Sequence, residues 1–156
     1  GNNVAHSLIQ GGSLAGMQVV VATPDGLGPD ATIVAEARKL AGGTGGAVDT
    51  VSDPGEAVKG ADVVYTDVWT SMGDREDEDG SRRRLLAPYR VDSELMAQAS
   101  ESAIFMHCLP AHRGDEVVTE VIDGPQSAVA DQAENRMHTE QGLLVALLTG
   151  ALTGAR

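Results

Sequence analysis

The sequence predicts an α/β protein with a doubly wound, mostly parallel sheet and helices on both faces. Short apolar runs alternate along the chain with segments in which apolar residues recur at helical spacing. The apolar runs lack the alternation of a half-exposed strand, which is typical of strands covered by helices on two sides. The 156 residues are therefore expected to form one Rossmann-like domain, spanning 1–156.

In the first half of the chain, each expected helix begins at a residue suited to capping it. Asn2 or Asn3 can cap a helix that runs to about Leu14, and Asp30 can cap a second helix that ends at a glycine pair, 42–43. A short helix at 54–59 has proline near its start. A continuous apolar run predicts a strand at 17–22, and further short strands are expected at 47–51 and 62–66.

The second half begins with a polar, heavily charged segment, 71–84, which is expected to be a surface loop. Asp92 can then cap a helix that runs to about Ala99. The elements expected after it are a strand at 104–107, a helix at 115–122, a last short strand at 128–130 and a long helix at 131–148. This final helix has apolar residues along one face.

Composition excludes several classes of function. The net charge of −12 argues against nucleic acids and anionic membranes as partners, because both require basic patches. A single cysteine forms no internal disulfide, so a cytoplasmic location is expected. This sequence leads us to expect neither a signal peptide nor a membrane-spanning segment. The chain starts without methionine, at a Gly-Asn-Asn typical of a strand-to-helix turn, so we expect a piece of a longer protein; a trimmed terminus explains it equally well.

Candidate functional residues lie where the expected strands end, because ligands of such sheets bind beyond the carboxyl ends of the strands. Asp67 follows one strand and could pair with a ligand ammonium, or cap a turn. Ser71 lies in the charged segment that comes next. Cys108 follows the strand at 104–107 and could be a nucleophile, a metal ligand or a small buried hydrophobe. Arg136 could hold an anion near the start of the last helix, or pair with a neighbouring glutamate.

No cofactor or metal is expected. No G-x-G-x-x-G follows a strand, which leaves a nicotinamide site without support. His107 and His112 flank Cys108, but the three lack a convincing zinc spacing.

Four segments, taken in order, closely resemble ornithine carbamoyltransferase. They are Gly-Asn-Asn at 1–3, Asp-Val-Trp-Thr-Ser-Met-Gly at 67–73, His-Cys-Leu-Pro-Ala-His-Arg-Gly-Asp-Glu at 107–116 and Ala-Glu-Asn-Arg at 133–136. The resemblance covers essentially the whole chain and corresponds to the second, amino-acid-binding domain. The Ser-Met-Gly loop together with the cysteine favours L-ornithine as the substrate.

The resemblance implies a role for each matching residue. L-ornithine would be bound by Asn3, Asp67, Ser71 and Met72. Carbamoyl phosphate would be bound by Cys108, Leu109 and Arg136. The δ-amine of ornithine attacks the carbamoyl carbon in this family, giving citrulline and phosphate. Cys108 would be the catalytic residue, as a group that positions the amine and handles its proton without a covalent step.

The motifs that this chain lacks relative to the family limit the expectation. The Ser-Thr-Arg-Thr and His-Pro-x-Gln motifs of the first domain do not occur. The isolated chain is therefore expected to be inactive, with the helix at about 131–150 missing the first domain on which it packs. The resemblance implies a homotrimeric parent in the cytoplasm that serves arginine biosynthesis or catabolism. The alternatives are a non-catalytic amino-acid-binding module, a nucleotide-binding α/β domain or a carbamoyltransferase for another amine.

Overall fold

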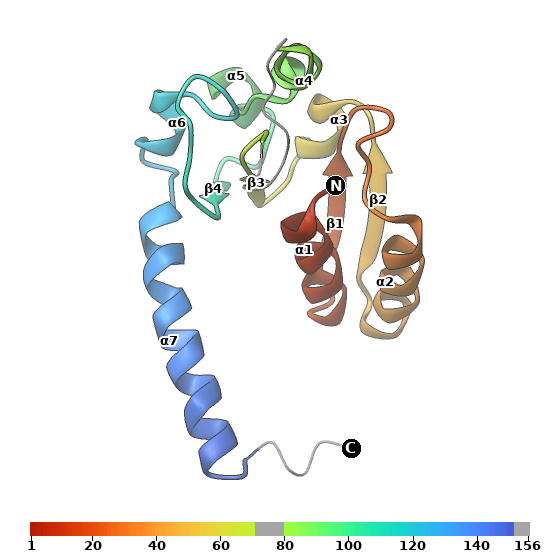
Figure 1. The fold of residues 1–156 in the computed structure, drawn as a ribbon, viewed down its shortest axis with the longest axis vertical. Helices are drawn as coiled ribbons and strands as arrows, with labels where there is room; N and C mark the ends of the chain where they lie inside the picture. The colour runs from red at the N-terminus through yellow and green to blue at the C-terminus, as the bar shows by residue number, and fades with distance from the viewer. Residues whose placement is uncertain (71–79, 152–156) are drawn as a thin grey trace.

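The structure, a computed structural model, describes residues 1–70 and 80–151. Helices and strands alternate along this part of the chain (Figure 1). In order, the elements are α1 (Asn3–Leu14), β1 (Gln18–Ala22), α2 (Ala31–Thr44), β2 (Ala47–Val51), α3 (Pro54–Val58), β3 (Val63–Thr66), α4 (Ser81–Leu86), η1 (Ala87–Tyr89), α5 (Ser93–Met96), β4 (Ile104–His107), α6 (Thr119–Ile122) and α7 (Val129–Leu148).

All four strands pair in parallel, which confirms the α/β class. β1 pairs with β2 and β3 pairs with β4, so the described strands form two two-stranded sheets. The strands expected at 17–22, 47–51, 62–66 and 104–107 are all present within one residue. Asp30 and Asp92 cap α2 and α5 as expected, and of the two candidates for α1 it is Asn2 that accepts a hydrogen bond from the Ala5 N–H.

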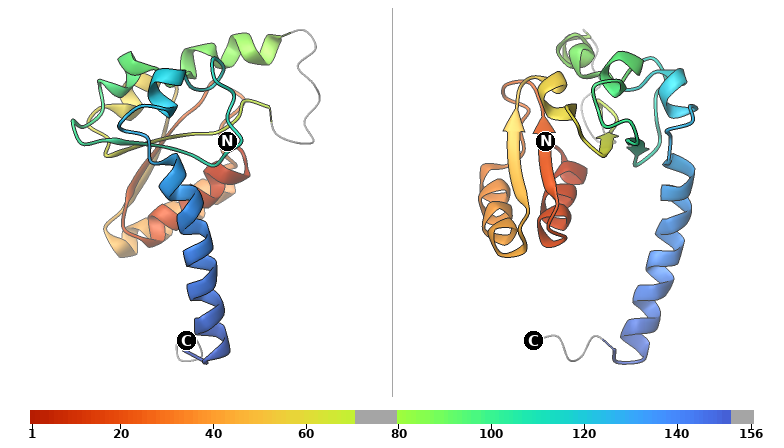
Figure 2. Two further views of the ribbon diagram at one scale, coloured as in Figure 1. Left: turned by 90° about the vertical axis from the view of Figure 1, so that its left-hand side faces the viewer. Right: turned by 180° about the vertical axis from the view of Figure 1, so that it is seen from behind.

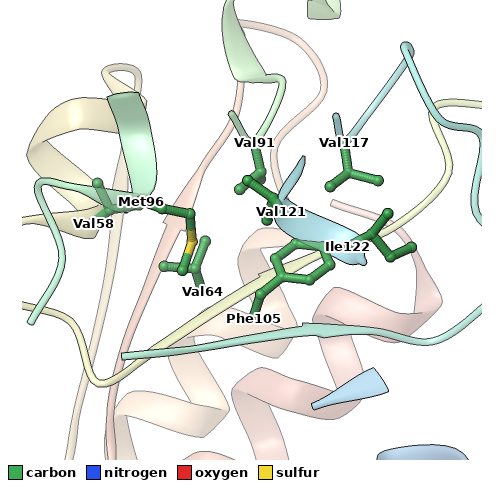
Figure 3. Close-up of a cluster of buried hydrophobic side chains, with 8 residues drawn as sticks. All are labelled: Val58, Val64, Val91, Met96, Phe105, Val117, Val121 and Ile122. Atoms are coloured by element: carbon green, nitrogen blue, oxygen red, sulfur yellow. The ribbon is translucent and has the colours of Figure 1, made fainter. Parts of the chain in front are cut away.

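Two hydrophobic cores hold the strand pairs. The first lies where α1 and α2 cover β1 and β2, and consists of Ile9, Val34, Ala37 and Val48. The second lies between the β3–β4 pair and helices α3, α5 and α6 (Figure 3), and its members are Val58, Val64, Val91, Met96, Phe105, Val117, Val121 and Ile122. Phe105 is the largest of its fully buried side chains.

The opposite faces of the strands are less covered than the apolar runs predict. Val20 of β1 is 43% exposed, and the cross-strand neighbours Val63 and Ile104 are 45% and 38% exposed. Val63 and Ile104 point away from the core that contains Val64 and Phe105, because successive side chains of a strand alternate between its faces. The described residues provide no element that buries these three side chains.

Three expected elements differ in the structure. The sequence predicts a loop throughout 71–84, but α4 begins at Ser81; residues 71–79 lie outside the described part. The helix expected at 115–122 is reduced to α6, because the Gly114 N–H donates to the Val117 carbonyl and the Val91 N–H to that of Glu116. The helix expected from Asp92 to about Ala99 is likewise reduced to α5, 93–96.

The last expected strand, 128–130, is wrong. Within this segment of the chain, Ser127 forms an isolated parallel bridge to Phe105. The Phe105 N–H donates to the Gln126 carbonyl, and the Ala128 N–H donates to the Phe105 carbonyl. The chain then enters α7 at Val129, two residues earlier than expected. α7 extends away from the other elements (Figure 2), and none of its residues is buried. None of the helices within 1–70 and 80–151 is both long and apolar enough to cross a lipid bilayer.

Candidate active site at the carboxyl ends of β3 and β4

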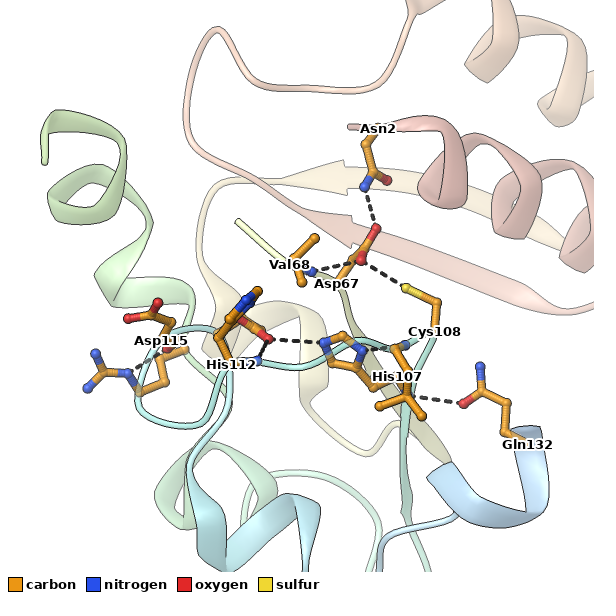
Figure 4. Close-up of polar contacts among 11 residues, drawn as sticks. Asn2, Asp67, Val68, His107, Cys108, His112, Asp115 and Gln132 are labelled. Atoms are coloured by element: carbon orange, nitrogen blue, oxygen red, sulfur yellow. Dashed lines mark hydrogen bonds and ion pairs between the residues drawn. The ribbon is translucent and has the colours of Figure 1, made fainter. Parts of the chain in front are cut away.

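The candidate site forms where β3 and β4 end side by side. Thr66 and His107 are register partners in the parallel pair, so Asp67 and Cys108 each follow the last residue of a strand at the same sheet edge. The Cys108 thiol donates a hydrogen bond to Asp67 Oδ1 over 2.8 Å (Figure 4). Two residues separated by 41 positions, and predicted separately, are thus in direct contact.

The Asp67 carboxylate is shared among three donors. Its Oδ1 also accepts the Val68 N–H at 2.7 Å, while its Oδ2 accepts the side-chain amide of Asn2. Asn2 at the same time caps α1 with its own amide oxygen. Asn3, which the resemblance implies as an ornithine-binding residue, is exposed in the first turn of α1, and its neighbour Asn2 contacts Asp67.

The Cys108 thiol is strongly disposed to keep its proton. Burial raises its pKa, and the hydrogen bond and negative charge of Asp67 raise it further, to about 12. Tyr65 acts in the opposite direction and lowers this pKa. Because thiolates are the nucleophilic form of cysteine, this environment favours a neutral thiol that donates a hydrogen bond.

A buried histidine–glutamate pair supports the backbone next to Cys108. His107 Nδ1 accepts the Leu109 N–H at 2.8 Å, so the proton of the ring lies on Nε2, which donates to Glu116 Oε1 over 3.3 Å. Both side chains are fully buried, and Glu116 also accepts the His112 N–H. Leu109 itself has a left-handed backbone, with φ of 56°, and precedes a cis Leu109–Pro110 bond.

Hydrogen bonding outweighs burial at Glu116. Burial raises the pKa of its carboxyl, but the hydrogen bonds from His107 and from the backbone of His112 more than offset this, and the net pKa lies below its usual range. Glu116 Oε2 is buried and makes no hydrogen bond; it lies 3.9 Å from His112 Nδ1. Glu116 was not predicted as a site residue, because nothing in the sequence indicates that its side chain turns inward.

Arginines fix the loop between β4 and α6. The Arg90 guanidinium donates through Nε to the Asp115 carbonyl at 2.7 Å and lies 5.9 Å from the centre of the buried Trp69 ring. Arg83 forms a 2.5 Å ion pair with the Asp115 carboxylate. This loop is therefore tied to the segment that contains Arg83 and Arg90.

The remaining predicted residues are less closely gathered. Arg136 pairs with Glu140 over 3.0 Å on α7, and its side chain is 82% exposed. This is the surface ion pair that the sequence left open as the alternative to an anion site. Leu109 is 43% exposed beside Cys108. Ser71 and Met72 lie outside the described residues. Within 1–70 and 80–151, no three His, Cys, Asp or Glu side chains come together so as to hold a metal ion.

Comparison with known proteins gives one consistent result. Residues 1–147 match the family model described as aspartate/ornithine carbamoyltransferase, Asp/Orn binding domain. An ornithine carbamoyltransferase from Symbiobacterium thermophilum is 57% identical over 148 residues, which are 95% of this chain and 47% of the relative. The chain thus spans about half the length of the curated relatives it matches.

Solved structures agree with the sequence matches. The ornithine carbamoyltransferase from Pyrococcus furiosus superposes with a TM-score of 0.88 and 51% identity, over 92% of this chain and 46% of that one. An N-acetyl-L-ornithine transcarbamylase is more distant, with a TM-score of 0.80 and 30% identity over 92% of this chain and 44% of that one.

Proposed function

Because the chain belongs to the aspartate/ornithine carbamoyltransferase family, within its Asp/Orn binding domain, we propose that it is the ornithine-binding half of an ornithine carbamoyltransferase. The whole protein would convert carbamoyl phosphate and L-ornithine to L-citrulline and phosphate. The observation that carries the proposal is the 57% identity to an ornithine carbamoyltransferase over 95% of the chain. Since that match is only 47% of the relative, activity is proposed for the whole protein and not for this chain alone.

L-ornithine is proposed to bind at Asn3, Asp67, Ser71 and Met72. A carboxylate pairs well with a substrate ammonium, which supports a role for Asp67 at the end of β3. The contact between Asn2 and Asp67 supports adding Asn2 as a residue that orients this carboxylate. The roles of Ser71 and Met72 rest on the resemblance of 67–73 to the family motif.

Cys108 is proposed to position the reacting amine as a neutral thiol. The δ-amine must be deprotonated to attack the carbamoyl carbon, forming a C–N bond as the C–O bond to phosphate breaks. A thiol whose pKa is near 12 is a poor covalent nucleophile, but it is a hydrogen-bonding group next to Asp67. Its neutral state therefore supports a non-covalent role in catalysis.

Leu109 and Arg136 are proposed to contact carbamoyl phosphate together with Cys108. Leu109 directly follows Cys108, and the His107 ring holds its N–H. Arg136 is accessible, and a guanidinium suits a phosphate or carbonyl oxygen. To bind carbamoyl phosphate, Arg136 would have to release Glu140. Breaking an exposed ion pair costs little free energy.

The same family membership supports proposals about the whole protein. Residues 1–156 are proposed to form one domain, with the helix at about 131–150 packing on a first domain. Leu144 and Leu147, which are 57% and 58% exposed, support this packing. The whole protein is proposed to be a cytoplasmic homotrimer of arginine biosynthesis or catabolism; light scattering on it measures the number of subunits.

Another amine as substrate is the second candidate function. The N-acetyl-L-ornithine transcarbamylase shares the fold with 30% identity, while the ornithine enzymes range from 31% to 57%. The relatives of highest identity among these act on ornithine by name, which supports free L-ornithine as the substrate.

A chimera tests the proposal. The first half of the Symbiobacterium thermophilum enzyme is joined to this chain, and product formation is measured with L-ornithine, N-acetyl-L-ornithine and putrescine. We expect citrulline formation from L-ornithine, with the other two amines far slower. A folded chimera that prefers one of the other amines, or that carbamoylates none, contradicts the proposal.

A further inference from the structure

A chain of hydrogen bonds leads from the start of α7 to Cys108. The backbone N–H of His107, at the end of β4, donates to Gln132 Oε1 at 3.0 Å. Gln132 Nε2 donates to the Tyr65 hydroxyl oxygen at 2.9 Å. Figure 4 shows Gln132 reaching from the first turn of α7 toward the end of β4. Sequence reasoning identified neither Tyr65 nor Gln132 as a functional residue.

The direction of these bonds is fixed by chemistry. A backbone N–H can only donate, so the Gln132 atom that faces His107 must be the amide oxygen. The amide nitrogen therefore faces Tyr65 and donates to its oxygen. The single proton of the Tyr65 hydroxyl is then free to be donated in another direction.

The strand register brings Cys108 close to Tyr65. Tyr65 pairs with Met106 across the β3–β4 register, on the face opposite Val64 and Phe105. Cys108 follows Met106 by two residues. Because side chains alternate between the faces of a sheet, Cys108 is expected on the same face as Met106, as the diagonal neighbour of Tyr65. Burial raises the pKa of Tyr65, so the hydroxyl keeps its proton, and the neighbouring Tyr65 lowers the pKa of Cys108.

We propose that Tyr65 and Gln132 are positioning residues of the candidate site. Gln132, anchored by the His107 N–H, directs the Tyr65 hydroxyl at the Cys108 sulfur, and the Cys108 S–H is in turn directed at Asp67 Oδ1. The first turn of α7 thereby sets the orientation of the thiol. That these residues serve an active site rests on the proposed function. The hydrogen-bond network itself is tested without any substrate.

The test uses the fact that Cys108 is the only cysteine in the chain. The rate of its alkylation by iodoacetamide is measured against pH below the thiol pKa, where the rate follows the thiolate fraction. Tyr65→Phe removes a donor to the thiolate, so the profile is expected to shift to higher pH, with alkylation about three- to tenfold slower at a given pH. Tyr89→Phe is the matched control, since Tyr89 donates to the Ser52 carbonyl and its loss should leave the profile unchanged.

Gln132→Glu separates orientation from packing. Glutamate keeps an acceptor for the His107 N–H, but it turns the donor to Tyr65 into an acceptor and so draws the Tyr65 proton away from the sulfur. The negative charge of the new glutamate also slows alkylation by raising the thiol pKa. The double variant with Tyr65→Phe lacks the hydroxyl, so it measures this charge effect alone. We expect Gln132→Glu to slow alkylation more with Tyr65 present than without it.

Two results would overturn the inference. Tyr65→Phe could leave the alkylation profile in place, or Gln132→Glu could slow the reaction equally in both backgrounds. Circular dichroism on each variant confirms that the fold persists. Neither ornithine nor carbamoyl phosphate is used in this test. The alkylation result can therefore contradict the network while the chimera still makes citrulline, and an inactive chimera leaves the alkylation result intact.

Discussion

Asp67 controls the protonation of Cys108. Its carboxylate accepts a hydrogen bond from the thiol, and this hydrogen bond and the carboxylate charge both raise the thiol pKa. Asp67→Asn removes the charge, so the pKa of Cys108 should fall and its alkylation at a fixed alkaline pH should become faster, by about tenfold for each pKa unit lost. The exposed Asp62, at the other end of β3, gives the matched control Asp62→Asn, for which no change is expected. A slower reaction in Asp67→Asn would contradict the geometry described.

Glu116 predicts a pH-dependent contribution to stability. Its pKa in the folded chain lies below the usual value, so its carboxylate stabilises the fold above the unfolded pKa, and this contribution is lost as pH falls through the folded pKa. Glu116→Gln should therefore lower the free energy of unfolding by about 1–3 kcal/mol near neutral pH. The difference from the parent chain should shrink below about pH 4.

Urea unfolding at several pH values measures this difference. Glu120→Gln is the control, because Glu120 is exposed in α6 and its substitution should have little effect at any pH. A Glu116→Gln penalty that grows as the pH falls would contradict the account.

At the level of single residues, sequence reasoning identified the polar residues at strand ends and missed those that reach the site from other segments. Asp67 and Cys108 could be predicted because they come directly after apolar runs. Glu116 and Gln132 could not, because their roles depend on a turn at Gly114 and on the approach of α7 to β4.

At the scale of elements, the strands were predictable and the short helices were not. Apolar residues predominate in every strand of the described residues, although β2 also contains Asp49 and Thr50. The segment 115–118 is expected from the sequence to begin a helix, but its backbone forms hydrogen bonds with Val91 and Gly114 instead. Its two valines are weak helix formers, which favours this outcome. The segment 128–130 is not a strand, because α7 begins at Val129.

The apolar face of α7 carries a prediction of its own. Leu144→Glu combined with Leu147→Glu should change the free energy of unfolding of this chain by no more than about 0.5 kcal/mol, because both side chains are exposed. In the chimera the same pair should lower citrulline formation, since the proposed packing on the first domain is lost. Phe105→Ala serves as the contrast. Because Phe105 lies in the buried core, this substitution should lower the free energy of unfolding of this chain by about 3–5 kcal/mol. A large loss of stability from the α7 pair would show that its leucines already pack within this chain.

At the scale of the whole molecule, the described chain presents one half of a proposed site. It holds Asp67 and Cys108 in contact at the ends of two paired strands, and it spans about half the length of its relatives. The resemblance in four short segments predicted the family, and two of those segments meet at one sheet edge through this contact. The four segments do not predict that the strands divide into two separate pairs. Strand pairing depends on backbone hydrogen bonds between strands, which apolar runs in the sequence do not reveal.

The most direct test of the proposal is citrulline formation from L-ornithine and carbamoyl phosphate, measured for the chimera, for the chimera with Asp67→Asn and for this chain alone. We predict a clear rate for the chimera, a large loss with Asp67→Asn and no product above background from the chain alone. A folded chimera without activity, or citrulline made by the isolated chain, would contradict the account.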